Sequence, residues 1–170
     1  MLAQQGTSLV KWYTNSGALE ELEEGINSLR RANGFIPDNH PMKPGCLNDL
    51  GSSFFHRFKR LGDIADLNKA ITTQQQAVHL TPDGHLDKPG CLSNLGISFR
   101  RRFERLDDIA DLDKVIMTQQ QAVCLTPDDH PDKPGCLNSL GNSFRHRCER
   151  LGDIADLNDA IATQQHPSSV

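Results

Sequence analysis

Cysteine and histidine side chains are the groups of this 170-residue chain that could form a metal or redox site. One of each recurs every 45 residues: Cys46, Cys91 and Cys136, and His40, His85 and His130. Such a site needs its members to converge, but equivalent helices in a stack lie about 8–10 Å apart, beyond the ~7 Å between α-carbons that a disulfide tolerates. We therefore expect half-buried apolar thiols and turn-contacting imidazoles, with no metal and no cofactor.

Cys148 and His146 could act as a nucleophile and its base. Cys148, however, occupies the place that Phe58 and Phe103 hold in the preceding units, on an apolar helical stripe. Residues two apart on a helix also point to different faces. We predict a structural role for Cys148, and a chain that is not an enzyme.

Basic side chains gather at Arg100-Arg101-Arg102, a run that could bind phosphate, although the chain carries a net charge of −4. This balance excludes the basic footprint of a nucleic-acid-binding protein. We expect these charges to lie on solvated faces and to pair between helices. No apolar run reaches the roughly 18 residues of a membrane span, and no signal peptide is evident. With five cysteines and no Cys-x-x-Cys pair, a reduced, cytoplasmic protein is expected.

The elements that position these residues come from an internal repeat with a period of 45. Segments 46–90 and 91–135 agree at 32 of 45 positions, which establishes the repeat. The sequence predicts one array over 1–170, with units 1–45, 46–90 and 91–135, a partial unit 136–165 and a disordered tail 166–170.

Each unit is predicted to form two antiparallel helices. In the second unit apolar residues recur at three- and four-residue steps, first from Leu47 to Leu61 and then from Ile64 to Val78. Asp63 is a suitable N-cap between the two stripes, and Thr81-Pro82 ends the second helix. The fold class is therefore all-α.

A glycine lies inside the first helix of each later unit, at Gly51, Gly96 and Gly141, where it costs about 1 kcal/mol relative to alanine. We expect the two helices of every unit to cross closely there, so that Gly96→Leu separates them.

Leu50-Gly51, Ala70, Ala77 and Pro82 resemble the tetratricopeptide (TPR) repeat, which carries Leu-Gly in its first helix and a spaced Ala-Ala-Pro in and after its second. Val115 departs from this pattern. The period of 45 exceeds the family's usual 34 and fits the HEAT repeat better by length, but the Leu-Gly and Ala-Ala-Pro spacing favours TPR. One extra turn of the first helix, carrying Phe58 and Leu61, accounts for part of the added length.

The resemblance implies a right-handed α-solenoid of antiparallel helix pairs that acts as a protein-binding scaffold in the cytoplasm. A closer resemblance is to the long TPR arrays of mushroom-forming fungi, which often continue into a peptidase domain of the CHAT type. The alternative is therefore a truncated regulatory segment of a larger protein with such a domain. Neither end carries an evident polar cap, which predicts self-association or a longer array.

In TPR proteins the first helices line a concave groove that binds peptides. Asparagine and arginine in adjacent units could clamp the carboxylates of an acidic peptide or C-terminus. The resemblance implies that the partner is a protein or peptide with acidic residues. We expect neither a nucleic acid nor a membrane as the partner. The lining positions map onto Lys11, Asn48, Ser52, Phe55, His56, Asn94, Ile97, Arg100, Arg101, Asn138, Asn142, Arg145 and His146.

Overall fold

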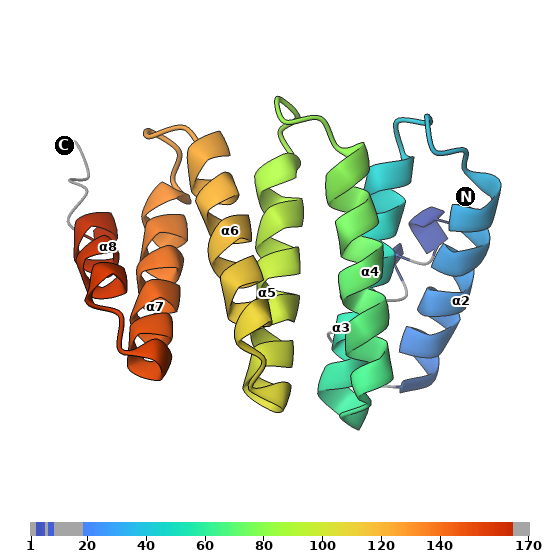
Figure 1. The fold of residues 1–170 in the computed structure, drawn as a ribbon. Coiled ribbons are helices and arrows are strands. Elements are labelled where there is room, and N and C mark those ends of the chain that lie inside the picture. Colours follow the sequence, from blue (N-terminus) through green and yellow to red (C-terminus); the bar gives the residue numbers. More distant parts are fainter. Residues whose placement is uncertain (1–2, 6, 9–18, 165–170) are drawn as a thin grey trace. The chain divides into compact units, whose positions relative to one another are not determined.

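The structure is a computed structural model that describes residues 3–5, 7–8 and 19–164. Its longer elements are all α-helices, and no strand occurs among the described residues, so the all-α prediction is confirmed (Figure 1). Lys11 and the predicted tail 166–170 lie outside the described residues. The helices are α2 (Leu19–Phe35), α3 (Lys43–Leu61), α4 (Ile64–Leu80), α5 (Lys88–Leu106), α6 (Ile109–Leu125), α7 (Lys133–Leu151) and α8 (Ile154–Gln164).

The chain divides into two compact units, 1–85 and 86–170, each built from consecutive helices that pack on one another. In the first unit α3 packs against both α2 and α4. Its core joins Leu22, Ile26 and Leu29 of α2 to Phe54 of α3 and Ala70 of α4. These are the apolar positions of the three- and four-residue pattern, which places one face of each helix in the core.

In the second unit α5 packs against α6, α6 against α7, and α7 against α8. Ile116 of α6 forms a core cluster with Leu140 and Phe144 of α7 and with Ala160 of α8. On α8 itself, Ile154 and Ile161 are exposed.

The helix boundaries follow from the capping residues that the repeat carries. Asp63 accepts a hydrogen bond from the backbone N–H of Ala65 at 2.9 Å, and Asp108 accepts one from Ala110 at 3.0 Å. A proline stands in the first turn of α3, α5 and α7, where its missing N–H leaves no helical hydrogen bond unmade. The N-cap, the end of α4 before Pro82 and the extra turn of the first helix are confirmed.

One detail of the apolar stripe is wrong. Phe58 is buried as predicted, but Leu61 is 53% exposed, and its counterparts Leu106 and Leu151 are similarly exposed. Leu61 is the last residue of α3, directly before the left-handed Gly62 that turns the chain toward α4. The buried stripe of the first helix therefore ends at Phe58.

Asp107 ends α5 in the left-handed conformation, with φ 55°, where Gly62 and Gly152 end α3 and α7. This region is sterically costly for a residue with a Cβ. Asp107 also pairs with Arg150 at 2.8 Å, but both side chains are more than half exposed, so the pair contributes little. We expect Asp107→Gly to raise the free energy of unfolding by about 0.5 kcal/mol, because relief of the left-handed strain outweighs the added freedom of the unfolded chain.

Differential scanning calorimetry of Asp107→Gly should show a midpoint about 1–2 °C higher. The reverse change at the equivalent position, Gly152→Asp, should lower the midpoint. A lower midpoint for Asp107→Gly would show that the Arg150 pair matters more than the backbone strain.

The close helix crossing predicted for every unit occurs at Gly51 and is not seen at Gly96. A Cβ on Gly51 would lie 2.6 Å from Cγ of Gln74 and 3.2 Å from the carbonyl oxygen of Ala70. A Cβ on Gly96 would meet Gln119 at 3.8 Å, an ordinary van der Waals contact. Val115 stands in α6 where α4 has Ala70, and its larger buried side chain accounts for the wider spacing. The reason given for Gly96→Leu therefore applies to Gly51.

Candidate functional site

A bidentate ion pair joins the two helices in each of the hairpins α3–α4, α5–α6 and α7–α8. Nε and Nη2 of Arg57 each donate a 2.7 Å hydrogen bond to the carboxylate of Asp66, and Arg102 binds Asp111 with the same two distances. Arg147 binds Asp156 in the same way, at 2.9 and 2.7 Å. Parallel N–H···O bonds from one guanidinium to one carboxylate are among the stronger charge-assisted hydrogen bonds. We call these three contacts the hairpin ion pairs.

An aromatic ring supports each hairpin ion pair. The guanidinium carbon of Arg57 lies 5.7 Å from the ring centroid of Phe54, and Arg102 and Arg147 lie 5.7 Å from Phe99 and Phe144. The hydrogen bonds from Arg57 lower the pKa of Asp66, and the same contact raises the pKa of Arg57. Both groups therefore stay charged at neutral pH.

Arg102 is thereby removed from the candidate phosphate-binding run. The expectation that charges pair between helices is confirmed for this residue, but its partner Asp111 was not predicted. The signal was present as an arginine followed nine residues later by aspartate in each later unit, spanning the turn between its two helices.

The lysine before each repeated proline is also structural. Nζ of Lys43 donates to the carbonyl oxygens of Asn33 and Ile36, at 2.7 and 2.8 Å, at the end of α2. Nζ of Lys133 donates in the same way to Val123 and Thr126 of the preceding helix end. A cation placed at a helix C-terminus satisfies carbonyl groups that the helix leaves unpaired.

Cys46, His40 and His130 make the packing and turn contacts that we expected, but Cys46 and Cys91 are fully buried rather than half-buried. Cys46 is buried, its thiol donates to the carbonyl oxygen of Leu29 at 3.7 Å, and burial raises its pKa. Nδ1 of His40 accepts from the backbone N–H of Met42 at 3.1 Å, and His130 accepts from Asp132 at 3.2 Å. Within the described ranges, no group of three His, Cys, Asp or Glu could hold a metal ion.

The candidate groove residues of α3 are only partly buried. Asn48, Ser52, Phe55 and His56 lie on its less buried positions, and the Phe55 ring meets the His56 ring edge-on at 6.3 Å. Burial, with a smaller contribution from the charge of Lys59, lowers the pKa of His56. The neutral form of His56 is therefore favoured at pH 7, so that His56 adds less positive charge to this face than an ordinary histidine would.

The candidate groove residues of α5 and α7 form a repeated charge arrangement. Arg101 lies 2.7 Å and Arg100 3.9 Å from Glu104, whereas Arg145 lies 2.8 Å and His146 3.4 Å from Glu149. All of these side chains are about half exposed. Ile97 and Asn138 are also exposed, and Asn94 and Asn142 are partly buried. Each helix thus presents basic groups around one glutamate.

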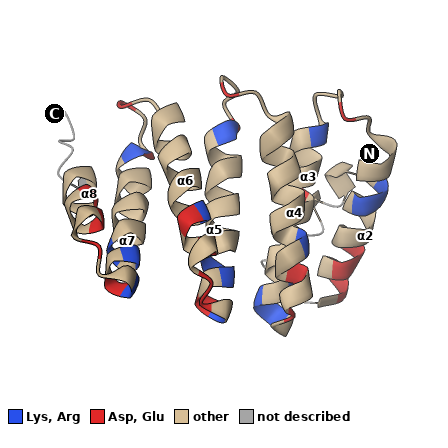
Figure 2. Ribbon diagram, in the orientation of Figure 1, with Lys and Arg blue, Asp and Glu red and all other residues tan. Residues whose placement is uncertain are grey.

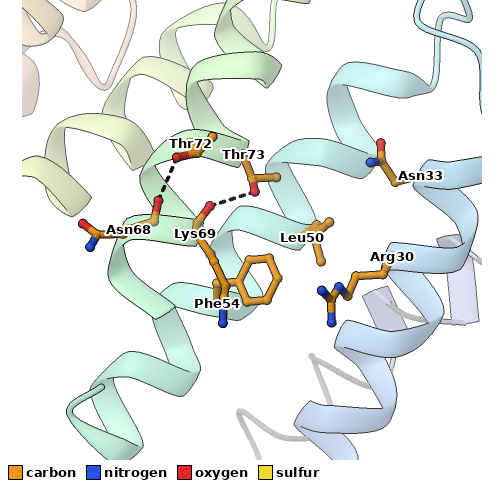
Figure 3. Close-up of a pocket in the computed structure, with 8 residues that line it drawn as sticks. All are labelled: Arg30, Asn33, Leu50, Phe54, Asn68, Lys69, Thr72 and Thr73. Atoms are coloured by element: carbon orange, nitrogen blue, oxygen red, sulfur yellow. Dashed lines mark hydrogen bonds between the residues drawn. The ribbon is translucent and has the colours of Figure 1, made fainter. Parts of the chain in front are cut away.

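A pocket that the sequence analysis did not find lies between α2, α3 and α4 and has a volume of about 490 Å³ (Figure 3). None of the candidate groove residues that the structure describes lines it. In the sequence, the feature that could have indicated this pocket is a departure from the repeat, because Arg30 stands where later units carry Gln75 and Gln120. Its lining residues are Arg30, Asn33, Leu50, Phe54, Asn68, Lys69, Thr72 and Thr73.

The helix pairs and their order along the chain define a TPR-like repeat fold. The structure is similar to that of a Podosopora anserina kinesin light chain with nearly identical TPR-like repeats, with a TM-score of 0.67, 13% identity and coverage of 99% of this chain and 81% of that chain. It is also similar to MamA, with a TM-score of 0.59, 18% identity and coverage of 96% and 77%. No protein-family model and no curated protein matches the sequence. Among the described helices, none is both long and apolar enough to cross a membrane.

Proposed function

We propose that the chain is a non-enzymatic scaffold that binds an acidic peptide segment of a partner protein on the exposed faces of α5 and α7, the first helices of the second unit. The TPR-like fold supports an interaction role in general, because helical repeats bury their apolar faces on one another and leave long polar faces for partners. Cys46, His40 and His130 are engaged in packing and turn contacts, which favours structural roles for these three side chains.

The observation that carries the proposal is the repeated basic group on α5 and α7. Arg100 and Arg145 occupy equivalent positions, and each lies beside a glutamate on its own helix. Exposed pairs of this kind contribute about 0–1 kcal/mol, so a partner's carboxylate can replace the glutamate at little cost. Arginine also binds carboxylates with two hydrogen bonds, which favours aspartate or glutamate in the partner.

Arg101→Glu should weaken the binding of an acidic peptide at least tenfold, because it reverses one charge of this group and leaves the core untouched. The measurement is fluorescence anisotropy with labelled peptides rich in Asp and Glu, each compared with its Asn and Gln counterpart. Arg31→Glu is the matched control, since Arg31 is an exposed arginine on α2, a second helix of its unit, and does not belong to the basic group of α5 and α7. Equal affinities for wild type and Arg101→Glu would contradict the proposal, and so would equal binding of the Asn and Gln peptides.

A further inference from the structure

The pocket between α2, α3 and α4 combines an apolar floor with basic walls. Leu50 and Phe54 of α3 form the floor, and each is 5% exposed or less. Arg30 reaches toward the Phe54 ring from α2, and Lys69 reaches it from α4 (Figure 3). A concave site of several hundred cubic ångströms with a few convergent polar groups is typical of ligand sites.

The charge around the Phe54 ring is positive. The cationic groups of Arg30, Arg57 and Lys69 lie 5.9, 5.7 and 5.9 Å from its centroid. Asp66 binds Arg57 with two hydrogen bonds and Lys69 with one, and the Glu23 carboxylate acts on Arg57 from α2. Three cations thus face two carboxylates, and Arg30 has no ion pair in the described part of the chain. Figure 2 shows that the acidic residues of α2 lie in its first half, away from the Arg30 end.

The polar groups of the walls include unused hydrogen-bond capacity. The side-chain oxygen of Asn33 is buried and accepts no hydrogen bond within the described residues. The hydroxyl groups of Thr72 and Thr73 donate to carbonyl oxygens of their own helix, at 3.0 and 2.7 Å, so their oxygens remain acceptors. A ligand that carries an N–H donor beside an anionic group could donate a hydrogen bond to these oxygens and pair its anionic group with the basic side chains.

The second unit shows that the fold itself does not require these residues. The equivalent place between α6, α7 and α8 has Gln120 where α2 has Arg30, and Val123 where α2 has Asn33. Asp159 replaces Lys69 there. The equivalent helices therefore pack with a neutral amide, a valine and a carboxylate at these positions, so helix packing does not account for the basic residues of the α2–α3–α4 pocket.

We propose that the α2–α3–α4 pocket binds a peptide residue that carries a carboxylate: the carboxylate contacts Arg30 and Lys69, the carbon chain covers Phe54 and Leu50, and a peptide N–H donates to Asn33. The surplus of one positive charge matches a single carboxylate better than a phosphate, which carries about −1.5 to −2 at pH 7. The inference does not rest on the proposed function, because none of the groove residues of α3, α5 and α7 takes part.

The test is a titration of the ¹⁵N-labelled full chain followed by NMR. The probes are acetyl-Gly-Leu-Glu-Gly-amide, which has a side-chain carboxylate, acetyl-Gly-Leu-Gly, which has a C-terminal one, and acetyl-Gly-Leu-Gln-Gly-amide, which has none. We expect at least one carboxylate probe to shift the Arg30 Nε–H and Asn33 side-chain signals, and its identity gives the source of the carboxylate. The glutamine probe should bind at least fivefold more weakly.

Two substitutions replace pocket residues by the residues that stand at the equivalent positions of α6. They test whether the pocket side chains bind the probe, and they should keep the fold. Arg30→Gln and Asn33→Val should each weaken the carboxylate probe at least fivefold, and circular dichroism should show unchanged helix content. Arg31→Gln removes the same charge from the neighbouring residue, outside the pocket, and should leave the dissociation constant within twofold.

The inference is overturned if none of the probes shifts these signals, if the glutamine probe binds equally well, or if Arg31→Gln weakens binding as much as Arg30→Gln. Tighter binding of the phosphoserine version of the probe would also overturn it. Loss of binding in Arg101→Glu with full binding in Arg30→Gln would contradict the pocket and support the first-helix face. The opposite pattern would support the pocket and contradict the proposed function.

Discussion

Replacing Asp111 by alanine should lower the free energy of unfolding of the second unit by about 3 kcal/mol. The Asp111 side chain is 1% exposed and is the shared partner of Arg102, at 2.7 Å, and of Lys114, at 3.5 Å. Its removal takes from the Arg102 guanidinium, which lies against the Phe99 ring, the carboxylate that it binds with two hydrogen bonds. Breaking a buried pair costs about 3–5 kcal/mol, and the low end applies because Arg102 keeps a fifth of its side chain in solvent.

Urea denaturation followed by far-ultraviolet circular dichroism measures this effect. The matched control is Glu104→Ala, because Glu104 also pairs with two cations, Arg100 and Arg101, but is 42% exposed. The control should cost less than about 1 kcal/mol. If the two variants were equally stable, the hairpin ion pairs would be no more than surface pairs.

The same ion pairs predict how stability depends on pH. The hydrogen bonds from Arg57 lower the pKa of Asp66. For Asp111 burial acts to raise the pKa, but Arg102 and Lys114 together lower it by more. A carboxyl whose pKa is lower in the folded state than its unfolded value of about 3.9 contributes stability above that pH and loses it as the pH falls through the folded pKa. Wild type should therefore lose stability below about pH 4, and Asp111→Ala should lose less over the same range.

Gly51→Ala should destabilise the first unit by about 1–3 kcal/mol, whereas Gly96→Ala should stabilise the second by up to about 1 kcal/mol. Both changes add one methyl group inside a first helix, where alanine is intrinsically preferred to glycine. At Gly51 the methyl would lie 2.6 Å from Cγ of Gln74, which is buried, and 3.2 Å from a backbone oxygen that cannot move independently. At Gly96 the contacts are ordinary, so only the gain in helix propensity remains.

The measurement is again urea denaturation, with each variant compared with wild type under the same conditions. The two glycines serve as controls for each other, because they occupy equivalent positions of units that agree at 32 of 45 positions. Destabilisation of similar size at both sites would mean that the wider spacing at Val115 has no energetic consequence. Stabilisation at both would mean that Gln74 can leave the interface easily.

The sequence by itself determined the helices and their limits. The 45-residue period, the apolar steps of three and four, the N-cap aspartates and the prolines are local signals, and each acts within a few residues of the position that it fixes. The class of fold also followed, because a hairpin that repeats with little change buries its apolar face against copies of itself. The burial predicted for Leu61 was wrong because it relied on the same local periodicity. The apolar pattern continues to the end of the helix, but the packing against the neighbouring helix ends earlier.

The tertiary structure decided which side chains face one another. Arg102 was assigned to a basic run because its neighbours in sequence are arginines, but its partner Asp111 lies on the next helix, where only the crossing geometry brings it within 2.7 Å. The same dependence on spacing separates Gly51 from Gly96, although the two occupy equivalent positions of the repeat. The pocket at Arg30 was missed because its walls come from three helices, and a period predicts what recurs rather than a group of residues that occurs once. Contacts between helices change when the helix spacing changes by a few tenths of an ångström. The volumes of the side chains on both sides of the interface determine this spacing, and the sequence pattern of one helix does not contain that information.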